Sequence, residues 1–150
     1  MTHAEFKEKL EDIVSPERWG AMPMVCAELR PQLISCDQDK LELVLAFDTK
    51  DWMGNPVRWL HGGIMAIMFD NGMFVLPYYF AGGVFTPTVT MDINYLRPAP
   101  LVGRVYMHVR VIKPGRSLVH VHAEISPDTG FTKPYASATA IFAIPREAQK

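Results

Sequence analysis

The chain has 150 residues and a mass of 16.9 kDa, the size of one ordinary domain. Hydrophobic residues make up 49% and charged residues 21%, so the composition is that of a globular protein rather than a disordered one. The 15 basic and 16 acidic residues nearly balance, which argues against a general nucleic-acid binder. We therefore predict one domain over residues 1–150 that has no nucleic-acid partner.

The start of the chain and its cysteine content indicate a cytoplasmic protein. Residues Met1 to Glu17 are mostly polar and lack the charged and apolar regions of a secretion signal. The longest apolar stretch, His61 to Phe80, contains Asp70 and several helix breakers, which makes it a poor membrane span. Cys26 and Cys36 are too few for a disulfide framework or a cysteine-rich zinc site. We expect free thiols and no contact with a membrane.

The first part of the chain reads as one helix followed by two strands. Apolar residues at helical spacing predict an amphipathic helix over Thr2 to Ile13, so residues 1–20 would form an N-terminal helix and a linker. Strands are expected at Met24 to Ser35 and at Lys40 to Phe47, and the second alternates apolar residues with period two. Thr49 to Trp59 follows as a loop.

A long apolar run occupies the middle of the chain. The run from Ile64 to Leu76 is too long for a typical buried strand and is apolar nearly all round. Such a run predicts a helix that is buried on most sides. Gly82 and Gly83 mark the end of this segment.

From Val84 onward the pattern changes to strands separated by short turns rich in proline and glycine. The strands are expected at Val84 to Leu96, Val102 to Ile112, Ser117 to Ile125 and Tyr135 to Ile144. Short connections imply antiparallel hairpins, and therefore a meander. One buried helix with a long antiparallel sheet predicts an α+β domain in which the sheet wraps around the helix.

Asp70 is the one acidic or basic side chain, histidine aside, between His61 and Phe80. Burying a lone carboxylate in a helix is costly unless the protein uses it, so Asp70 is a candidate general base. The alternative is a structural role in which Asp70 is hydrogen-bonded to a turn or an interface partner. Burial of the helix does not by itself separate these interpretations.

Gly62 and Gly63 stand where this helix begins. Unpaired N–H groups and the positive end of the helix dipole can polarise a carbonyl there, although an ordinary glycine-rich helix start is the alternative. Gly63 and Asp70 are seven residues apart, which places them on one face and roughly 10 Å apart along the axis. Two antiparallel helices across a two-fold axis would bring Gly63 of one chain near Asp70 of the other, so we predict a dimer with shared sites.

Several motifs, in order and with matching spacing, carry a resemblance to a known family. They are Asn55-Pro56, His61-Gly62-Gly63, Asp70-Asn71, the segment from Asp92 to Ala99 and the segment from Pro114 to Leu118. From about residue 40 to residue 144 the chain resembles the hotdog-fold acyl-CoA thioesterases of the phenylacetate-pathway (PaaI) type. In that family a curved antiparallel sheet wraps a long helix and two protomers join their sheets edge to edge, so the resemblance implies a hotdog fold.

The resemblance also implies roles for individual residues. The amide of Gly63 would polarise the thioester carbonyl, helped by Asn55 and His61. Asp70 would come from the partner subunit and would activate water or attack directly. Thr90, on the next strand, would orient that water or the acid.

The loop before the helix departs from the family at one place. The family often has glycine three residues before the histidine, where this chain has Arg58 followed by Trp59. We therefore expect the backbone of this loop, which contains Asn55, to differ from the family's.

The stretch from Ile93 to Ala123 carries basic residues and no acidic one. The five basic residues are Arg97, Arg104, Arg110, Lys113 and Arg116. A basic stripe suits the phosphates of a nucleotide, although a solvated sheet edge would look the same. Given the resemblance, we expect Lys113, Arg116, Arg97 and Gly62 to contact CoA.

His120 and His122 alternate onto one strand face, where Glu124 is the only nearby candidate for a further ligand. Tetrahedral metal sites need three or four ligands, so a surface or interface pair is the favoured interpretation. We expect no metal and no cofactor.

We predict an acyl-CoA thioesterase that hydrolyses a thioester to a free acid and CoA. It would act as a homodimer, with two dimers forming a homotetramer. A hotdog hydratase or dehydratase and a non-catalytic acyl-CoA sensor are the alternatives. The His-Gly-Gly…Asp pattern favours the thioesterase, and the presence of Asp70, Gly63 and Thr90 together argues against a loss of catalysis.

Overall fold

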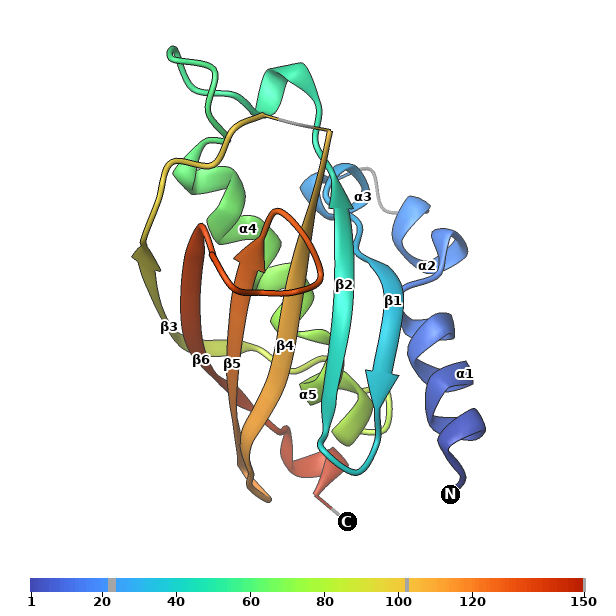
Figure 1. The fold of residues 1–150 in the computed structure, drawn as a ribbon. Helices are drawn as coiled ribbons and strands as arrows, with labels where there is room; N and C mark the ends of the chain where they lie inside the picture. The colour runs from blue at the N-terminus through green and yellow to red at the C-terminus, as the bar shows by residue number, and fades with distance from the viewer. Residues whose placement is uncertain (22–23, 102, 150) are drawn as a thin grey trace.

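The computed structural model describes residues 1–21, 24–101 and 103–149, and in them a six-stranded antiparallel sheet curves around a central helix (Figure 1). The strand order is β1-β2-β4-β5-β6-β3. The strands are β1 (Gln32–Asp37), β2 (Glu42–Asp48), β3 (Thr88–Tyr95), β4 (Arg104–Pro114), β5 (Leu118–Ser126) and β6 (Ala136–Ala143). The helices are α1 (His3–Ile13), α2 (Pro16–Gly20), α3 (Val25–Glu28), α4 (Gly62–Met73) and α5 (Val75–Phe80), with single 3-10 turns at η1 (Asp51–Met53) and η2 (Arg146–Ala148). The predicted α+β architecture is confirmed.

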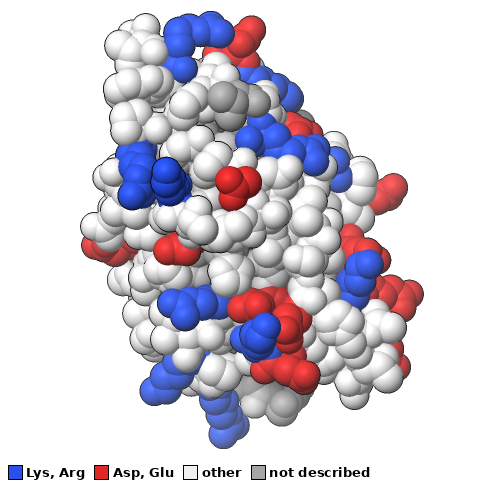
Figure 2. All heavy atoms as spheres, in the orientation of Figure 1, with Lys and Arg blue, Asp and Glu red and all other residues white. Residues whose placement is uncertain are grey.

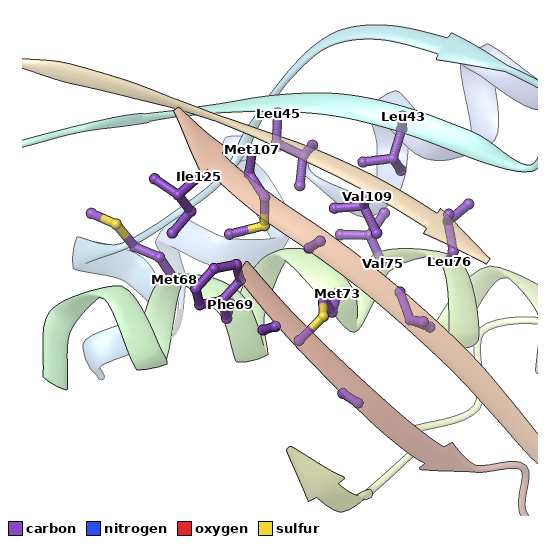
Figure 3. Close-up of a cluster of buried hydrophobic side chains, with 14 of the residues drawn as sticks. Leu43, Leu45, Met68, Phe69, Met73, Val75, Leu76, Met107, Val109 and Ile125 are labelled. Atoms are coloured by element: carbon purple, nitrogen blue, oxygen red, sulfur yellow. The ribbon is translucent and has the colours of Figure 1, made fainter. Parts of the chain in front are cut away.

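The core lies between α4 and the concave face of the sheet, as Figure 3 shows. Met68, Phe69 and Met73 of α4 are wholly buried there among side chains of β2, β4 and β5. A Cβ atom on Gly72 would lie 2.5 Å from Sδ of Met107, so the glycine leaves room for this buried side chain where α4 packs against β4. The face of α4 away from the sheet is less covered than predicted, because Gly63 is exposed on it.

The apolar run forms two helices in continuous succession. Phe74 joins α4 to α5 with φ −62° and ψ −29°, so the backbone stays helical through the junction. Pro77 has no N–H to donate to the carbonyl four residues earlier, that of Met73, which is the residue at which α4 ends. Over residues 1–21, 24–101 and 103–149, no helix is both long enough and apolar enough to cross a membrane.

The N-terminal segment differs from the predicted helix and linker. The helix α1 is confirmed and is capped by Thr2 and Glu5, but a second helix, α2, replaces the linker. Ser15 accepts a hydrogen bond from the amide of Arg18, and Pro16 is the first residue of α2. The Ser-Pro pair is a helix-start signal, and the sequence interpretation assigned these residues to the linker.

The predicted strand at Met24 to Ser35 is wrong in its first half. Val25–Glu28 forms the helix α3, and the strand begins at Gln32. The side chain of Asn71 on α4 donates a hydrogen bond to the carbonyl of Leu29 over 3.1 Å, which holds the end of α3 against α4. This contact between distant segments decides the local conformation.

The predicted meander is correct for β4, β5 and β6 but wrong for β3. β3 pairs with β6, whereas β4 pairs with β2 and β5. The proline-rich connection after β3 does not form a tight turn, because it crosses the open end of the sheet: Leu60 donates to the carbonyl of Ala99, and Thr49 to that of Gly103. The next strand, predicted from Val102, begins at Arg104, and Val102 itself lies outside the described residues.

Candidate active site

Asp70, in the third turn of α4, faces the beginning of β3. Oγ1 of Thr88 donates a hydrogen bond to Oδ1 of Asp70 over 2.7 Å. Asp70 is half-buried rather than buried, so its carboxylate is open to a ligand. In the described part of the chain, the second carboxylate oxygen accepts no hydrogen bond. One oxygen is therefore fixed in direction and the other remains available for a water molecule or an acyl carbon.

A β-bulge decides which threonine reaches the acid. Thr88 pairs with Phe142 and Thr90 pairs with Ile141, so Val89 is an extra residue in β3. Directly paired residues share a face of the sheet, and Phe142 is buried on the helix side whereas Ile141 is half-exposed on the outer side. The structure therefore places Thr90 on the outer face and brings Thr88 to the acid of α4.

The beginning of α4 is capped by a histidine side chain. Nδ1 of His61 accepts a hydrogen bond from the N–H of Gly63 over 2.9 Å, so the amide predicted to polarise a carbonyl already has an acceptor. Because Nδ1 accepts, this contact assigns the ring proton of the neutral imidazole to Nε2. His61 and Gly63 are both exposed, and in the described part of the chain the Nε2–H of His61 has no hydrogen-bond partner, whereas the amide of Gly63 is occupied by Nδ1.

Tyr95, at the far end of β3, fixes the same helix start from the sheet side. Its hydroxyl donates to the carbonyl of Gly62 over 2.8 Å, and a Cβ on Gly62 would lie 3.3 Å from the tyrosine ring. β3 thus contacts α4 twice, through Thr88 at Asp70 and through Tyr95 at Gly62. The sequence interpretation assigned no role to Tyr95, and its place on the helix side of β3 follows from its pairing with the buried Ala136.

Asn55 shapes the loop that leads to the helix. Its Oδ1 accepts hydrogen bonds from the amides of Val57 and Trp59, over 3.1 and 2.9 Å. Arg58, between them, has φ 64°, in the left-handed region that favours glycine. The departure from the family pattern thus falls where the backbone takes a conformation unusual for arginine.

A cavity of about 630 Å³ lies beside Asp70. Asp70 and Thr88 line it, together with residues of α2, α3, α4, α5 and the segment before β3. Its volume is in the range of small-molecule sites. Asp70 therefore lies at the wall of a cavity that is large enough for a small-molecule ligand.

The predicted basic stripe is not continuous. Arg97 donates to the carbonyl of Pro134, and Arg104 to Oδ1 of Asp48. Lys113 and Arg116 are exposed at the β4–β5 turn, at the end of the sheet away from the start of α4 (Figure 1). On the face drawn in Figure 2, basic and acidic side chains are scattered among uncharged ones. The side chains of Lys113, Arg116 and Arg110, the last of which is exposed on β4, have no hydrogen-bond or ion-pair partner among the described residues and are the part of the stripe that is open to a phosphate.

His120 and His122 lie on β5, with Nδ1 of His122 3.4 Å from Oγ1 of Thr139. Burial lowers the pKa of His122, and the nearby charge of Arg110 acts in the same direction. Within residues 1–21, 24–101 and 103–149, no three His, Cys, Asp or Glu side chains are grouped to hold a metal ion.

Comparison with known proteins relates this geometry to one family. The family model described as the thioesterase superfamily matches residues 59–130, which include α4 and β3 to β5. A phenylacetic acid degradation-related protein from Ralstonia eutropha JMP134 is 26% identical, with a TM-score of 0.73 over 88% of this chain and 99% of that one. No curated protein matches the chain.

Two further solved structures share the fold. Mouse thioesterase superfamily member 2 is 18% identical, with a TM-score of 0.74 over 97% of this chain and 100% of that one. A Streptococcus mutans UA159 protein bound to acetyl-CoA is 19% identical, with a TM-score of 0.66 over 77% of this chain and 89% of that one. The family match over residues 59–130 and the shared fold together confirm the resemblance to hotdog-fold thioesterases that the motifs carried.

Proposed function

We propose that this protein hydrolyses acyl-CoA thioesters and that Asp70 supplies the base or the nucleophile. The observation that carries the proposal is the Asp70–Thr88 hydrogen bond at the wall of a cavity, in a fold of the thioesterase superfamily. The Streptococcus relative bound to acetyl-CoA supports a CoA thioester as the ligand. The matched family favours hydrolysis over the hydratase and sensor alternatives.

As a base, Asp70 accepts a proton from water while the water oxygen forms a bond to the acyl carbon. The carbon–sulfur bond then breaks, and the proton passes to the leaving sulfur, giving a free acid and the CoA thiol. As a nucleophile, an oxygen of Asp70 forms a bond to the acyl carbon while the carbon–sulfur bond breaks and the CoA thiolate leaves. Water then opens the mixed anhydride, which releases the free acid and restores the Asp70 carboxylate, and one proton of that water passes to the thiolate. Thr88 serves both routes because it holds one carboxylate oxygen in place.

The start of α4 supplies the groups that polarise the carbonyl. His61 presents its Nε2–H, and Gly63 presents its own N–H once the imidazole turns away from it. Asn55 supports both donors by closing the loop that precedes them. These donors stabilise the negative charge that develops on the carbonyl oxygen during attack.

One chain does not bring both the amide of Gly63 and the carboxylate of Asp70 to the same thioester carbonyl. Gly63 and Asp70 are separated by seven residues of α4, roughly 10 Å along the axis. In the described sheet β3 is an edge strand, and it exposes Val89 and Tyr95. An exposed apolar edge is a natural place for a second copy to pair, so we propose a homodimer with the partner subunit's Asp70 at each site, and a tetramer of two such dimers.

Lys113 and Arg116 are the proposed contacts of the CoA phosphates, with Arg97 and the Gly62 backbone as further contacts. The test of the proposed function is the release of free thiol from a panel of acyl-CoA esters incubated with the purified protein. We expect release above the rate without protein, and its loss in Asp70→Asn. Hydration of an enoyl-CoA without thiol release would favour the hydratase, and binding without turnover would favour the sensor.

A further inference from the structure

The cavity beside Asp70 has an apolar, aromatic interior. Its aromatic wall residues are Trp19, Phe74, Tyr78 and Phe85. The ring of Phe74 lies 5.1 Å from that of Tyr78 and 5.5 Å from that of Phe85, so these three side chains form one packed surface. Aromatic surfaces of this kind favour an apolar ligand and add specific contact with rings.

The cavity floor follows the helix away from the acid. Asp70, Phe74 and Tyr78 recur every four residues through α4 and α5, and the backbone between the two helices stays helical. From Asp70 to Tyr78 this floor is roughly 12 Å long. A group that begins at Asp70 and fills this space is much larger than acetyl.

The cavity offers no unpaired positive charge to an acyl group. Arg18 is the one lysine or arginine among the described lining residues, and its Nη2 lies 2.6 Å from Oδ2 of Asp12. Its Nη1 donates to the hydroxyl of Tyr78 over 3.4 Å. The guanidinium is thus already paired with a carboxylate, so the cavity has no unpaired cation to favour an acyl group that ends in a carboxylate.

The N-terminal helices form the opposite wall of the cavity. Nε1 of Trp19 donates to the carbonyl of Ile13 over 2.7 Å, so the indole presents only its apolar surface to the cavity. Cys26 of α3 lines the cavity beside Asn71, with Sγ 3.7 Å from Oδ1 of that residue. Trp19 and Cys26 both lie outside the residues that match the family model.

We propose that this cavity holds the acyl group and that the wall made by Trp19 and Cys26 sets its size, so that the protein prefers bulky, apolar, uncharged acyl groups over acetyl. The octanoyl group represents the aliphatic acyl groups of this class, and the phenylpropanoyl group represents the aromatic ones. The inference rests on the proposed thioesterase function, because Asp70 marks the end of the cavity at which the thioester lies.

The first experiment fills the cavity from the N-terminal wall. In Cys26→Phe we expect the ratio of kcat/KM for octanoyl-CoA over acetyl-CoA to fall by about tenfold or more, the scale on which a hydrophobic pocket discriminates. Ile34→Phe is the matched control, because Ile34 is 43% exposed on β1 and does not line the cavity. An unchanged ratio in Cys26→Phe together with normal thermal unfolding would overturn the proposal.

The second experiment measures occupancy without catalysis. In a Cys36→Ser protein the remaining thiol, Cys26, is alkylated by iodoacetamide in the presence of thioethers of CoA that cannot be hydrolysed. Cys26 is a free thiol that is only half-buried and lines the cavity, so the reagent can reach it and a ligand in the cavity can shield it. We expect S-octyl-CoA or S-phenylpropyl-CoA to slow alkylation several-fold more than S-ethyl-CoA, and the more protective of the two identifies the acyl form.

The two experiments distinguish a failure of the acyl-site proposal from a failure of the proposed thioesterase function. Protection by the long thioethers without thiol release from any acyl-CoA would contradict the proposed function but support the cavity as an acyl site. Thiol release with equal protection by the ethyl and long thioethers would support the function and overturn the cavity proposal.

Discussion

Thr88 on β3 donates a hydrogen bond to Asp70 on α4 over 2.7 Å, and this contact connects the edge strand of the sheet to the middle of the central helix. It depends on the extra residue Val89, which turns Thr88 toward the helix and Thr90 away from it. A bulge of this kind turns one side chain to the other face of the strand without changing the strand order.

Replacing the acid tests the proposed chemistry directly. Asp70→Asn keeps the shape and the hydrogen bond with Thr88 but removes the base, so we expect kcat to fall by about two orders of magnitude or more. KM changes much less, since the side chain keeps its volume. Steady-state thiol release on the best acyl-CoA measures both constants. A kcat within about threefold of the parent value, well inside that scale, would exclude Asp70 as the catalytic base or nucleophile.

The two threonines provide a matched pair of variants. Thr88→Val removes the hydroxyl that orients Asp70, and we expect kcat to fall by about tenfold, as for the loss of a hydrogen bond to a charged group of roughly 1.5 kcal/mol. KM stays nearly constant, and Thr88→Ser restores the rate because it restores the donor.

Thr90→Val is the control on the outer face of the same strand, and its kcat remains close to that of the parent. A large loss in Thr90→Val with no loss in Thr88→Val would instead support the role that the family resemblance gave to Thr90.

Variants in the β4–β5 turn test the proposed contact with the nucleotide of CoA. Changing Lys113 and Arg116 to Ala should raise KM for the CoA ester severalfold, because each charge that meets a phosphate contributes a charge-assisted hydrogen bond. A truncated pantetheine thioester lacks those phosphates, and its KM should stay the same. Changing Lys7 and Lys9 to Ala, both exposed on α1, removes the same number of positive charges and controls for the change in net charge. Equal losses on both substrates would place CoA elsewhere.

The shared site is tested by mixing two inactive variants. His61→Ala removes the carbonyl-polarising end and Asp70→Ala removes the acid, so each homodimer should be inactive. A mixed dimer collects both defects in one site and leaves the other intact. With random pairing about half of the dimers are mixed, so co-refolding should restore roughly a quarter of the parental activity under two-fold symmetry. No recovery, with mixed dimers confirmed by mass, would place each complete site within one chain.

His122 should make stability depend on pH. Burial, and then the charge of Arg110, lower the pKa of His122 in the folded state, while the nearby carboxylate of Glu124 opposes them. The unfolded chain therefore binds a proton at higher pH than the folded one, and stability falls as the pH drops below the ordinary histidine pKa of about 6.5. Thermal unfolding between about pH 7 and pH 5 should show a smaller loss in His122→Gln than in the parent. Parallel curves for the two proteins would contradict this assignment.

The sequence by itself determined the features that depend on local pattern. Alternating and helical periodicities predicted α1, α4 and most strands, since side chains repeat along each element with a fixed period. Asp70 stood out because it is an isolated charge in an apolar run, and the spacing of the motifs predicted the family. None of these inferences required knowledge of which segments meet in space.

Only the tertiary structure decided the relationships between distant segments. The pairing of β3 with β6 places the bulge at Val89, and so selects Thr88 rather than Thr90 as the partner of Asp70. Asn71 fixes the end of α3 against α4, where the local pattern predicted a strand. Strand pairing and helix packing bring together residues far apart in the chain, and their free energy comes from burial and hydrogen bonds that no local pattern records.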